Sequence, residues 1–175
     1  GGIMIKIDGK SHDEPLVLMS HYDVVQENGK WSFDAWSGKV ENGVVYGRGA
    51  VDTKGSLAAI FESVESLLSE GFAFSNDLYI ISSSREEIAG ADVPDMVKYL
   101  ADNGVKPKLV IDEGGAVLDG SLLGINSLVG MVGTCEKGYC DYTLTCEKAG
   151  GHASNPAKPS NLYLLSKAIC NLEKH

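Results

Sequence analysis

Short apolar runs alternate with longer amphipathic stretches over the first two thirds of the chain. Three runs are continuous and rich in Leu, Val and Ile, at 16–19, 78–81 and 109–111. Such runs are typical of strands that are buried on both faces of a sheet. Between them, apolar residues recur at helical spacing over 56–70 and 93–103, and a glycine follows each stretch. This order predicts an α/β layer structure in which helices connect the strands of a parallel sheet.

The remaining segments have other patterns. Residues 26–50 are rich in Gly, Asn, Ser and aromatics, and the turn signal Glu41-Asn42-Gly43 predicts a short hairpin there. Polar and apolar residues alternate over 139–145, which predicts a strand with one solvated face, and the chain is helical in pattern from about residue 160. Because the pattern of polar and apolar residues changes after Gly114-Gly115, we place a domain boundary near residue 118.

The composition excludes several classes of partner. The formal net charge is -9 and no basic run occurs, so we expect no nucleic-acid partner. No stretch reaches the roughly 18 apolar residues that a membrane span needs, and the N-terminus does not resemble a signal peptide. The four cysteines show no zinc-finger spacing. We therefore expect reduced thiols and a cytoplasmic location.

Polar side chains follow the predicted strands or lie in the loops beside them. They are His21-Tyr22-Asp23, Asp52 in a glycine-rich loop, Glu86-Glu87 and Asp112-Glu113. Any one of them alone is more often a solvated or hydrogen-bonded loop residue. Gathered at one edge of a sheet, however, the carboxylates would repel one another unless cations neutralised them. Oxygen donors combined with an imidazole suit zinc, manganese or cobalt.

The order of these motifs is His-x-Asp, Gly-Arg-Gly-x-x-Asp-x-Lys, Glu-Glu and Asp-Glu-Gly-Gly. It resembles the M20 metallopeptidases, and most closely their carboxypeptidase S-like and N-acyl-amino-acid hydrolase branch. The resemblance implies a three-layer catalytic domain with a mostly parallel sheet, followed by the start of an inserted α+β lid domain. Residues 1–118 would be the N-terminal part of the metal-binding catalytic domain, and 119–175 the beginning of the lid, or dimerisation, domain.

The resemblance also implies two zinc ions, although cobalt or manganese would suit the same donors. His21 and Asp112 would bind one ion, Asp52 would bridge both, and Glu87 would bind the other. In the family the last ligand is a histidine from a later segment that returns to the catalytic sheet. His175 ends this chain within or just after the last helix and is not a candidate for that ligand.

Three further residues match functional positions of the family. Glu86 would be the general base, Asp23 would orient the imidazole of His21, and His152 in a Gly-Gly-His motif would stabilise the oxyanion from the lid, often across a dimer. The alternatives are a surface acid, a loop-capping Asp and a turn His. The residue before the glutamate pair, usually acidic in this branch, is Arg85, which would lower the pKa of Glu86 if it pointed inward.

The expected function is hydrolysis of the amide bond of small peptides or N-acyl amino acids by metal-activated water. Within the enzyme class, the alternative is a biosynthetic N-deacylase of the acetylornithine or succinyl-diaminopimelate type. Outside it, the alternative is a non-catalytic metal-binding homologue. We expect residues 1–175 alone to be weakly active or inactive, because the second metal lacks a ligand, and we expect the intact protein to form a homodimer through its lid.

Overall fold

The computed structural model describes residues 1–149, 151–152 and 154–174, and these form two compact units, Gly1–Val132 and Gly133–His175. Gly150 and Ala153 of the predicted lid motif lie outside the described residues, as does His175.

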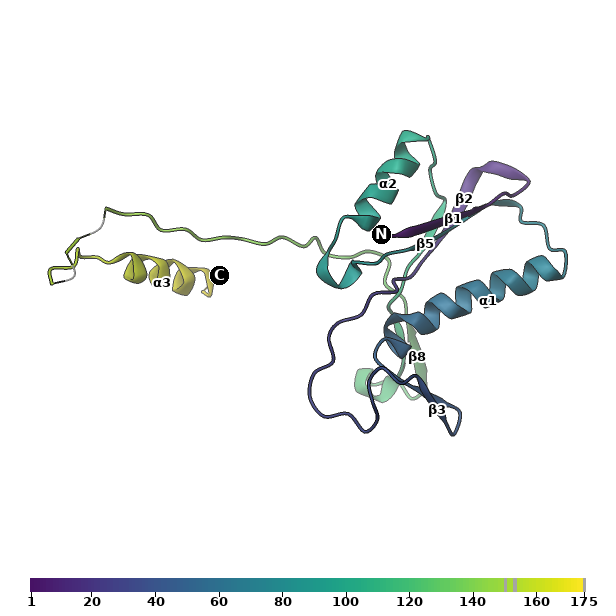
Figure 1. The fold of residues 1–175 in the computed structure, drawn as a ribbon, viewed down its shortest axis with the longest axis horizontal. Helices are drawn as coiled ribbons and strands as arrows, with labels where there is room; N and C mark the ends of the chain where they lie inside the picture. The colour runs from purple at the N-terminus through teal and green to yellow at the C-terminus, as the bar shows by residue number, and fades with distance from the viewer. Residues whose placement is uncertain (150, 153, 175) are drawn as a thin grey trace. The chain divides into compact units, whose positions relative to one another are not determined.

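The first unit is built on a four-stranded sheet whose strand order is β1-β5-β2-β6 (Figure 1). Strands β2, β5 and β6 are parallel, and β1 is antiparallel to β5 at the edge. The apolar runs predicted from the sequence are confirmed as β2, β5 and β6, whereas the edge strand β1 was not predicted. The strands are β1 (Ile3–Ile7), β2 (Ser11–Met19), β5 (Asn76–Ser82) and β6 (Leu109–Ile111).

Helices α1 (Gly55–Ser69) and α2 (Asp92–Asp102) cover opposite faces of this sheet. Successive residues of a strand point to opposite faces, and β5 uses both. Tyr79 and Ile81 form one buried cluster with a leucine of α2, while Leu78 and Ile80 form another with a valine of α1. The predicted three-layer α/β architecture is therefore confirmed. Each layer depends on β5, whose residues 77–82 are all buried.

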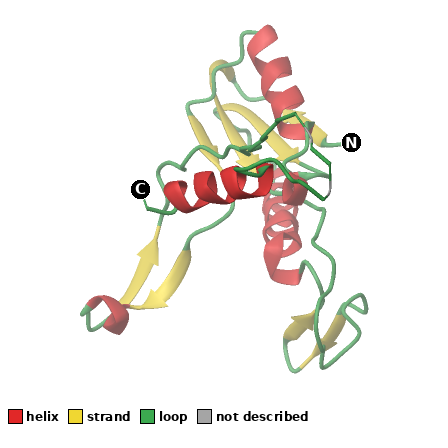
Figure 2. Ribbon diagram, turned by 90° about the vertical axis from the view of Figure 1, so that its left-hand side faces the viewer, coloured by secondary structure: helices red, strands yellow, loops and turns green. Residues whose placement is uncertain are grey.

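Glycines end both helices as the sequence predicted. Gly71 after α1 and Gly104 after α2 have φ of 77° and 71°, in the left-handed region that glycine adopts most readily. The predicted hairpin is also confirmed, with β3 (Lys39–Glu41) paired to β4 (Val44–Tyr46). Figure 2 shows it at the lower right, extending away from the central sheet. Its turn residues Asn42 and Gly43 both have positive φ, as a type I′ turn requires.

The connections place a site at the carboxyl ends of the strands. From β2 the chain passes through α1 to its neighbour β5, and from β5 it passes through α2 to β6 on the other side of β2. The first connection therefore runs along the sheet in one direction, from β2 to β5, and the second runs in the opposite direction, from β5 past β2 to β6. Open α/β sheets bind ligands in the crevice that such a reversal creates.

The rest of the first unit consists of short elements. Strands β7 (Ala116–Asp119) and β8 (Leu128–Met131) form an antiparallel pair joined through the 3₁₀ turn η3 (Gly120–Leu123). The π-helical turn η1 (Ala50–Lys54) precedes α1, and the 3₁₀ turn η2 (Glu86–Ile88) precedes α2. The predicted division near residue 118 falls within β7, and as a statement about the domains of the intact protein it stays a prediction.

The second unit contains α3 (Asn161–Leu172), which confirms the predicted helix, and Ser160 caps it by accepting a hydrogen bond from the amide of Tyr163. The strand predicted over 139–145 is wrong, because these residues form no strand. Alternation marks the faces that a strand would have, but a strand also needs a paired neighbour, and no other strand occurs among the described residues of this unit. In the part of the chain that the structure describes, no helix is long and apolar enough to cross a membrane.

Candidate metal centre

The carboxyl ends of β2, β5 and β6 bring the predicted polar residues to one edge of the sheet. His21 follows β2, Glu86 and Glu87 follow β5 within η2, and Glu113 follows β6. Backbone hydrogen bonding between β2 and β5 continues beyond the strands, since the amide of Tyr22 donates to the carbonyl of Ser83 at 2.9 Å. This continued pairing fixes His21 beside the segment that leads to η2.

The His21 side chain is only 2% exposed and faces three carboxylates. Its Nε2 lies 3.0 Å from Oδ1 of Asp52, 3.4 Å from Oε1 of Glu113 and 3.8 Å from Oε2 of Glu86. These oxygens come from η1, from the end of β6 and from η2. One buried nitrogen thus joins segments that are far apart in the sequence.

The other ring nitrogen of His21 determines the tautomer. Nδ1 lies 3.0 Å from the backbone carbonyl oxygen of Asp23, and a carbonyl can only accept a hydrogen bond. Nδ1 therefore carries the proton, and in the neutral ring the Nε2 lone pair is directed at the carboxylates. A lone pair facing negative oxygens is repulsive unless a cation, either a proton or a metal ion, lies between them.

The donor atoms are close enough to share such an ion. Two sets of side chains, one of His21, Asp52 and Glu87 and one of His21, Glu86 and Glu113, each have ligand atoms within 4.8 Å of one another. One imidazole nitrogen with several carboxylate oxygens is a donor set that zinc, cobalt and manganese accept. The residues therefore fit the metal that the sequence predicted.

The nearby basic side chains are directed elsewhere. The ammonium of Lys54 donates to the backbone carbonyl of Tyr22, and the guanidinium of Arg85 pairs with Asp92. Among the described residues, no Lys or Arg forms an ion pair with the carboxylates of the two sets, which are those of Asp52, Glu86, Glu87 and Glu113. The condition under which Arg85 would lower the pKa of Glu86, an inward-pointing side chain, is thus not met.

The crowding of carboxylates changes the protonation of the predicted base. Burial raises the pKa of Glu86, and the charges of Glu113, Glu87 and Asp23 raise it further against the opposing effect of His21. Burial alone would lower the pKa of His21, but Glu113, the Asp23 carbonyl and Asp52 raise it overall. Neighbouring negative charge contributes to both shifts, whereas burial raises the pKa of Glu86 and opposes the rise at His21.

The Asp23 carboxylate contacts both His21 and the turn that carries Glu86 and Glu87. Its carboxylate lies 3.4 Å from Nδ1 of His21, and its two oxygens also accept hydrogen bonds from the amides of Glu86 and Glu87, each at 3.1 Å. Like a side chain at a helix N-terminus, this carboxylate satisfies amides that the short 3₁₀ turn leaves without partners. Asp23 therefore links the predicted histidine ligand to the predicted base.

The loop carrying Asp52 is held at its glycines and by Ser20. Gly49 has φ of 81°, and a Cβ on Gly55 would lie 2.8 Å from the carbonyl oxygen of Ala50, so both positions favour glycine. Ser20 Oγ donates to the carbonyl of Thr53 at 3.1 Å. These contacts place the Asp52 carboxylate against His21.

Besides Asp23, the predicted site residues Asp112 and His152 are part of neither set. Asp112 accepts a hydrogen bond from the amide of Glu113 at 2.9 Å, and it is the neighbouring Glu113 that faces His21. The Asp-Glu-Gly-Gly motif contains both residues, and the sequence assigned the ligand role to Asp112. His152 lies in the second compact unit, where it is exposed and its Nδ1 is 2.8 Å from Oγ of Ser154. The roles assigned to Asp112 and His152 stay predictions.

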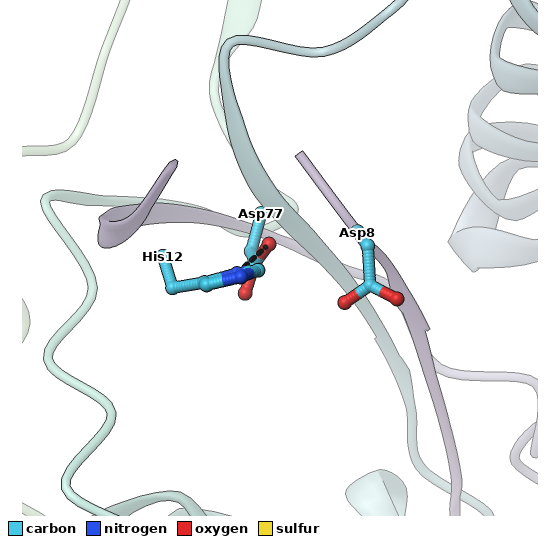
Figure 3. Close-up of side chains that lie close together, drawn as sticks. All are labelled: Asp8, His12 and Asp77. Carbon is cyan, nitrogen blue, oxygen red and sulfur yellow. Dashed lines mark hydrogen bonds and ion pairs between the residues drawn. The ribbon is translucent and has the colours of Figure 1, made fainter. Parts of the chain in front are cut away.

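A second group of histidine and carboxylates lies at the amino end of β5. The His12 ring meets the Asp77 carboxylate at 2.8 Å, with Asp8 alongside (Figure 3). The ammonium of Lys6 lies 2.7 Å from Asp8 and 2.9 Å from Asp77 and already supplies the positive charge. Burial would raise the pKa of Asp77, but the Gly9 amide, Lys6 and His12 lower it to about 2. This group is an ion-pair cluster.

Comparison with known proteins identifies the family to which the chain belongs. Residues 17–169 match the model of peptidase family M20/M25/M40. The chain is 37% identical over 98% of its length to N-fatty-acyl-amino acid synthase/hydrolase PM20D1 of Xenopus tropicalis, and 35% identical over 93% to probable carboxypeptidase S-like 2 of Dictyostelium discoideum. It spans about a third of these relatives, 34% and 32% of their lengths.

Solved structures show the same fold. The M20 family metallo-carboxypeptidase Sso-CP2 of Sulfolobus solfataricus matches 66% of this chain with a TM-score of 0.58 and 26% identity. Human carnosine dipeptidase 1 matches the same share with a TM-score of 0.57 and 21% identity. Each match covers 26% of the solved chain. The family model covers most of this chain and the motifs meet at one edge of its sheet, so the chain belongs to peptidase family M20/M25/M40.

Proposed function

We propose that the intact protein is a metal-dependent hydrolase that cleaves the amide bond of small peptides or N-acyl amino acids. The observation that carries this proposal is the environment of His21, whose Nε2 is buried against carboxylates of Asp52, Glu113 and Glu86 without a basic partner among the described residues. Such an arrangement attracts a cation, either a proton or a metal ion. Divalent ions held by imidazole and carboxylates activate water in many hydrolases.

The proposed ligands are His21, Asp52 and Glu87, together with an acid that follows β6. The sequence assigned that last role to Asp112, and the contact between Glu113 and His21 favours Glu113. Two zinc ions are proposed, with cobalt or manganese as substitutes. Bound divalent cations would polarise the substrate carbonyl and lower the pKa of water.

Glu86 is the proposed general base. Its carboxylate lies 3.8 Å from Nε2 of His21, beside the proposed metal ligands, where it could reach a metal-bound water. It would take a proton from the attacking water and deliver it to the nitrogen of the leaving amine. The C–N bond of the amide breaks as that nitrogen is protonated, giving a carboxylate and an amine.

His152 is proposed to donate a hydrogen bond to the oxyanion that develops on the substrate carbonyl. In this proposal it acts from the lid, across a homodimer. A His152→Ala variant of the full-length protein should lose turnover while keeping its metal content. Unchanged turnover would remove His152 from this role.

The names of the relatives support the substrate class. One relative is named for N-fatty-acyl amino acids and the other is a probable carboxypeptidase, and both substrates carry an amide beside a carboxylate-bearing residue. The biosynthetic N-deacylase is the alternative within the same chemistry. The cytoplasmic location also stays a prediction, which fractionation of cells producing the full-length protein would test.

The test is metal analysis followed by an amidase assay on the full-length protein. The panel contains dipeptides, N-fatty-acyl amino acids, N-acetylornithine and N-succinyl-diaminopimelate. Metal-dependent hydrolysis of the first two groups supports the proposal, and preference for the last two favours the biosynthetic deacylase. Bound metal without turnover of any substrate would indicate a non-catalytic homologue and overturn the proposal.

A further inference from the structure

The loop between β5 and α2, residues 83–91, carries Glu86 and Glu87 and is closed by a buried carboxylate. Asp92, the first residue of α2, has a side chain only 3% exposed. Its Oδ2 accepts hydrogen bonds from the amide of Ser84 at 2.9 Å and from the Ser84 hydroxyl at 2.5 Å. Its Oδ1 accepts from Nε and Nη2 of Arg85, at 3.1 and 2.7 Å. All four bonds reach the residues immediately before the proposed base.

Neighbouring groups stabilise the negative charge of the buried Asp92 carboxylate. The hydroxyl of Ser84, the guanidinium of Arg85 and the amide of Ser84 hold the pKa of this carboxyl well below its usual range. The N-terminus of a helix also favours an acidic residue in its first turn. Because Arg85 binds Asp92 with two donors, its side chain is held away from Glu86, and the backbone of residues 84–85 is fixed to the start of α2.

Further hydrogen bonds complete the enclosure of the loop. The amide of Gly90 donates a hydrogen bond to the carbonyl of Arg85 at 2.7 Å. The amide of Ala89 donates one to the carbonyl of Glu86 at 2.8 Å. A Cβ on Gly90 would lie 2.4 Å from Cβ of Arg85, so the loop passes too close for a larger residue. On its other side, the carboxylate of Asp23 binds the amide of Glu86. The peptide bearing Glu86 is thus held between two carboxylates.

We propose that Asp92 and Arg85 are positioning residues that set where the carboxylate of Glu86 lies. The proposal rests on the proposed function of Glu86 as the general base. Neither residue faces the metal ligands, and both act through the backbone of the loop. A displacement of about 1 Å in a catalytic group can cost on the order of 100-fold in rate. A variant in which this loop is no longer bonded to the start of α2 should therefore lose much of its turnover.

The experiment uses the full-length, metal-loaded protein and the single variants Arg85→Gln, Arg85→Lys and Asp92→Asn. Arg85→Gln and Asp92→Asn should lower kcat by about 10- to 100-fold with KM within about twofold of wild type and unchanged metal content. Arg85→Lys should retain more activity than Arg85→Gln, because it keeps the charge but loses the two-pronged contact. The double variant should lose little more than either single one, because the two residues form one interaction.

The matched control is the ion pair between Lys98 and Asp102 on the same helix, whose atoms are 2.7 Å apart and whose side chains are both largely exposed. Lys98→Gln and Asp102→Asn should leave kcat unchanged. The proposal is overturned if Arg85→Gln or Asp92→Asn shows the kcat of these controls, whatever its melting temperature. If Asp92→Asn does not fold, the two variants of the half-exposed Arg85 decide the question.

Glu86→Gln separates this proposal from the proposed function. If Glu86→Gln abolishes turnover while Arg85→Gln and Asp92→Asn leave it intact, only the positioning role fails. If Glu86→Gln keeps full turnover, the function proposed for this site fails.

Discussion

Two groups of histidine and carboxylates lie at opposite ends of the same sheet, and they obtain their positive charge differently. At the amino end of β5, the ammonium of Lys6 lies between Asp8 and Asp77, and His12 adds a third contact. At the carboxyl end, His21 faces several carboxylates, and two basic side chains of the adjoining loops, Lys54 and Arg85, are bonded elsewhere. In the first group a lysine supplies the positive charge, whereas in the second no Lys or Arg of the described residues pairs with the carboxylates that face His21.

This comparison shows why spacing alone does not identify a metal site. Both groups place three possible ligand atoms within 4.8 Å of one another. What distinguishes them is whether a lysine already occupies the centre, and in which direction the imidazole lone pair points. A structural ion pair and a catalytic metal site can therefore share residue types and differ in function.

The largest difference between the two groups is expected in turnover. Glu86→Gln in the full-length protein should lower kcat by about 10²- to 10⁴-fold, because the amide cannot take a proton from water, while metal content stays unchanged. The matched change at the other end, His12→Asn, should leave kcat at the wild-type value. Equal losses in the two variants would show that the assay reports general damage to the sheet.

Metal binding should depend on the group around His21 and not on the group around His12. At a zinc concentration of about 100 times Kd, ligand binding stabilises a folded protein by about 2.7 kcal/mol, so zinc should raise the melting temperature of the full-length protein. His21→Asn should abolish this shift, and His12→Asn should retain it. Differential scanning fluorimetry with and without a chelator measures both, and loss of the shift in His12→Asn would contradict the account.

A smaller effect is expected in the contribution of Asp8, His12 and Asp77 to the stability of the protein at acid pH. The pKa of Asp77 is lowered from 3.8 to about 2, so its contacts stabilise the fold above about pH 4 and lose this contribution as the pH falls toward 2. Lys6 has a raised pKa, so its contribution is complete below its ordinary pKa of 10.5 and is lost only as the pH rises beyond it.

Asp77→Asn should therefore flatten the fall in stability between pH 4 and 2. Thermal unfolding of the full-length protein with a chelator present would measure this without a contribution from metal loss. The exposed Asp102→Asn is the control and should keep the wild-type slope. A wild-type slope in Asp77→Asn would show that this carboxylate does not control the acid stability.

The sequence was sufficient for the parts of the fold that local pattern determines. Continuous apolar runs identified β2, β5 and β6, and helical spacing ended by Gly71 and Gly104 identified α1 and α2. Strand β1 was missed because it pairs with a strand more than 70 residues away, and its five residues are all at least partly exposed. The strand expected over 139–145 was wrong because alternation does not supply a partner strand.

For the site, the sequence correctly anticipated that the ends of three strands would meet, but it could not resolve side-chain direction. Asp112 and Glu113 are neighbours, and neighbours at the end of a strand point to opposite sides. The structure directs Glu113 toward His21. The direction of Arg85 was likewise open in the sequence and depends on Asp92, seven residues later.

The most direct test of the central claim is anomalous diffraction at the zinc edge from crystals of the full-length protein soaked in zinc. We expect strong peaks beside Nε2 of His21, within bonding distance of Asp52, Glu87 and an acid after β6, and none between His12 and Asp77. Peaks at the His12 group with none at His21 would contradict it.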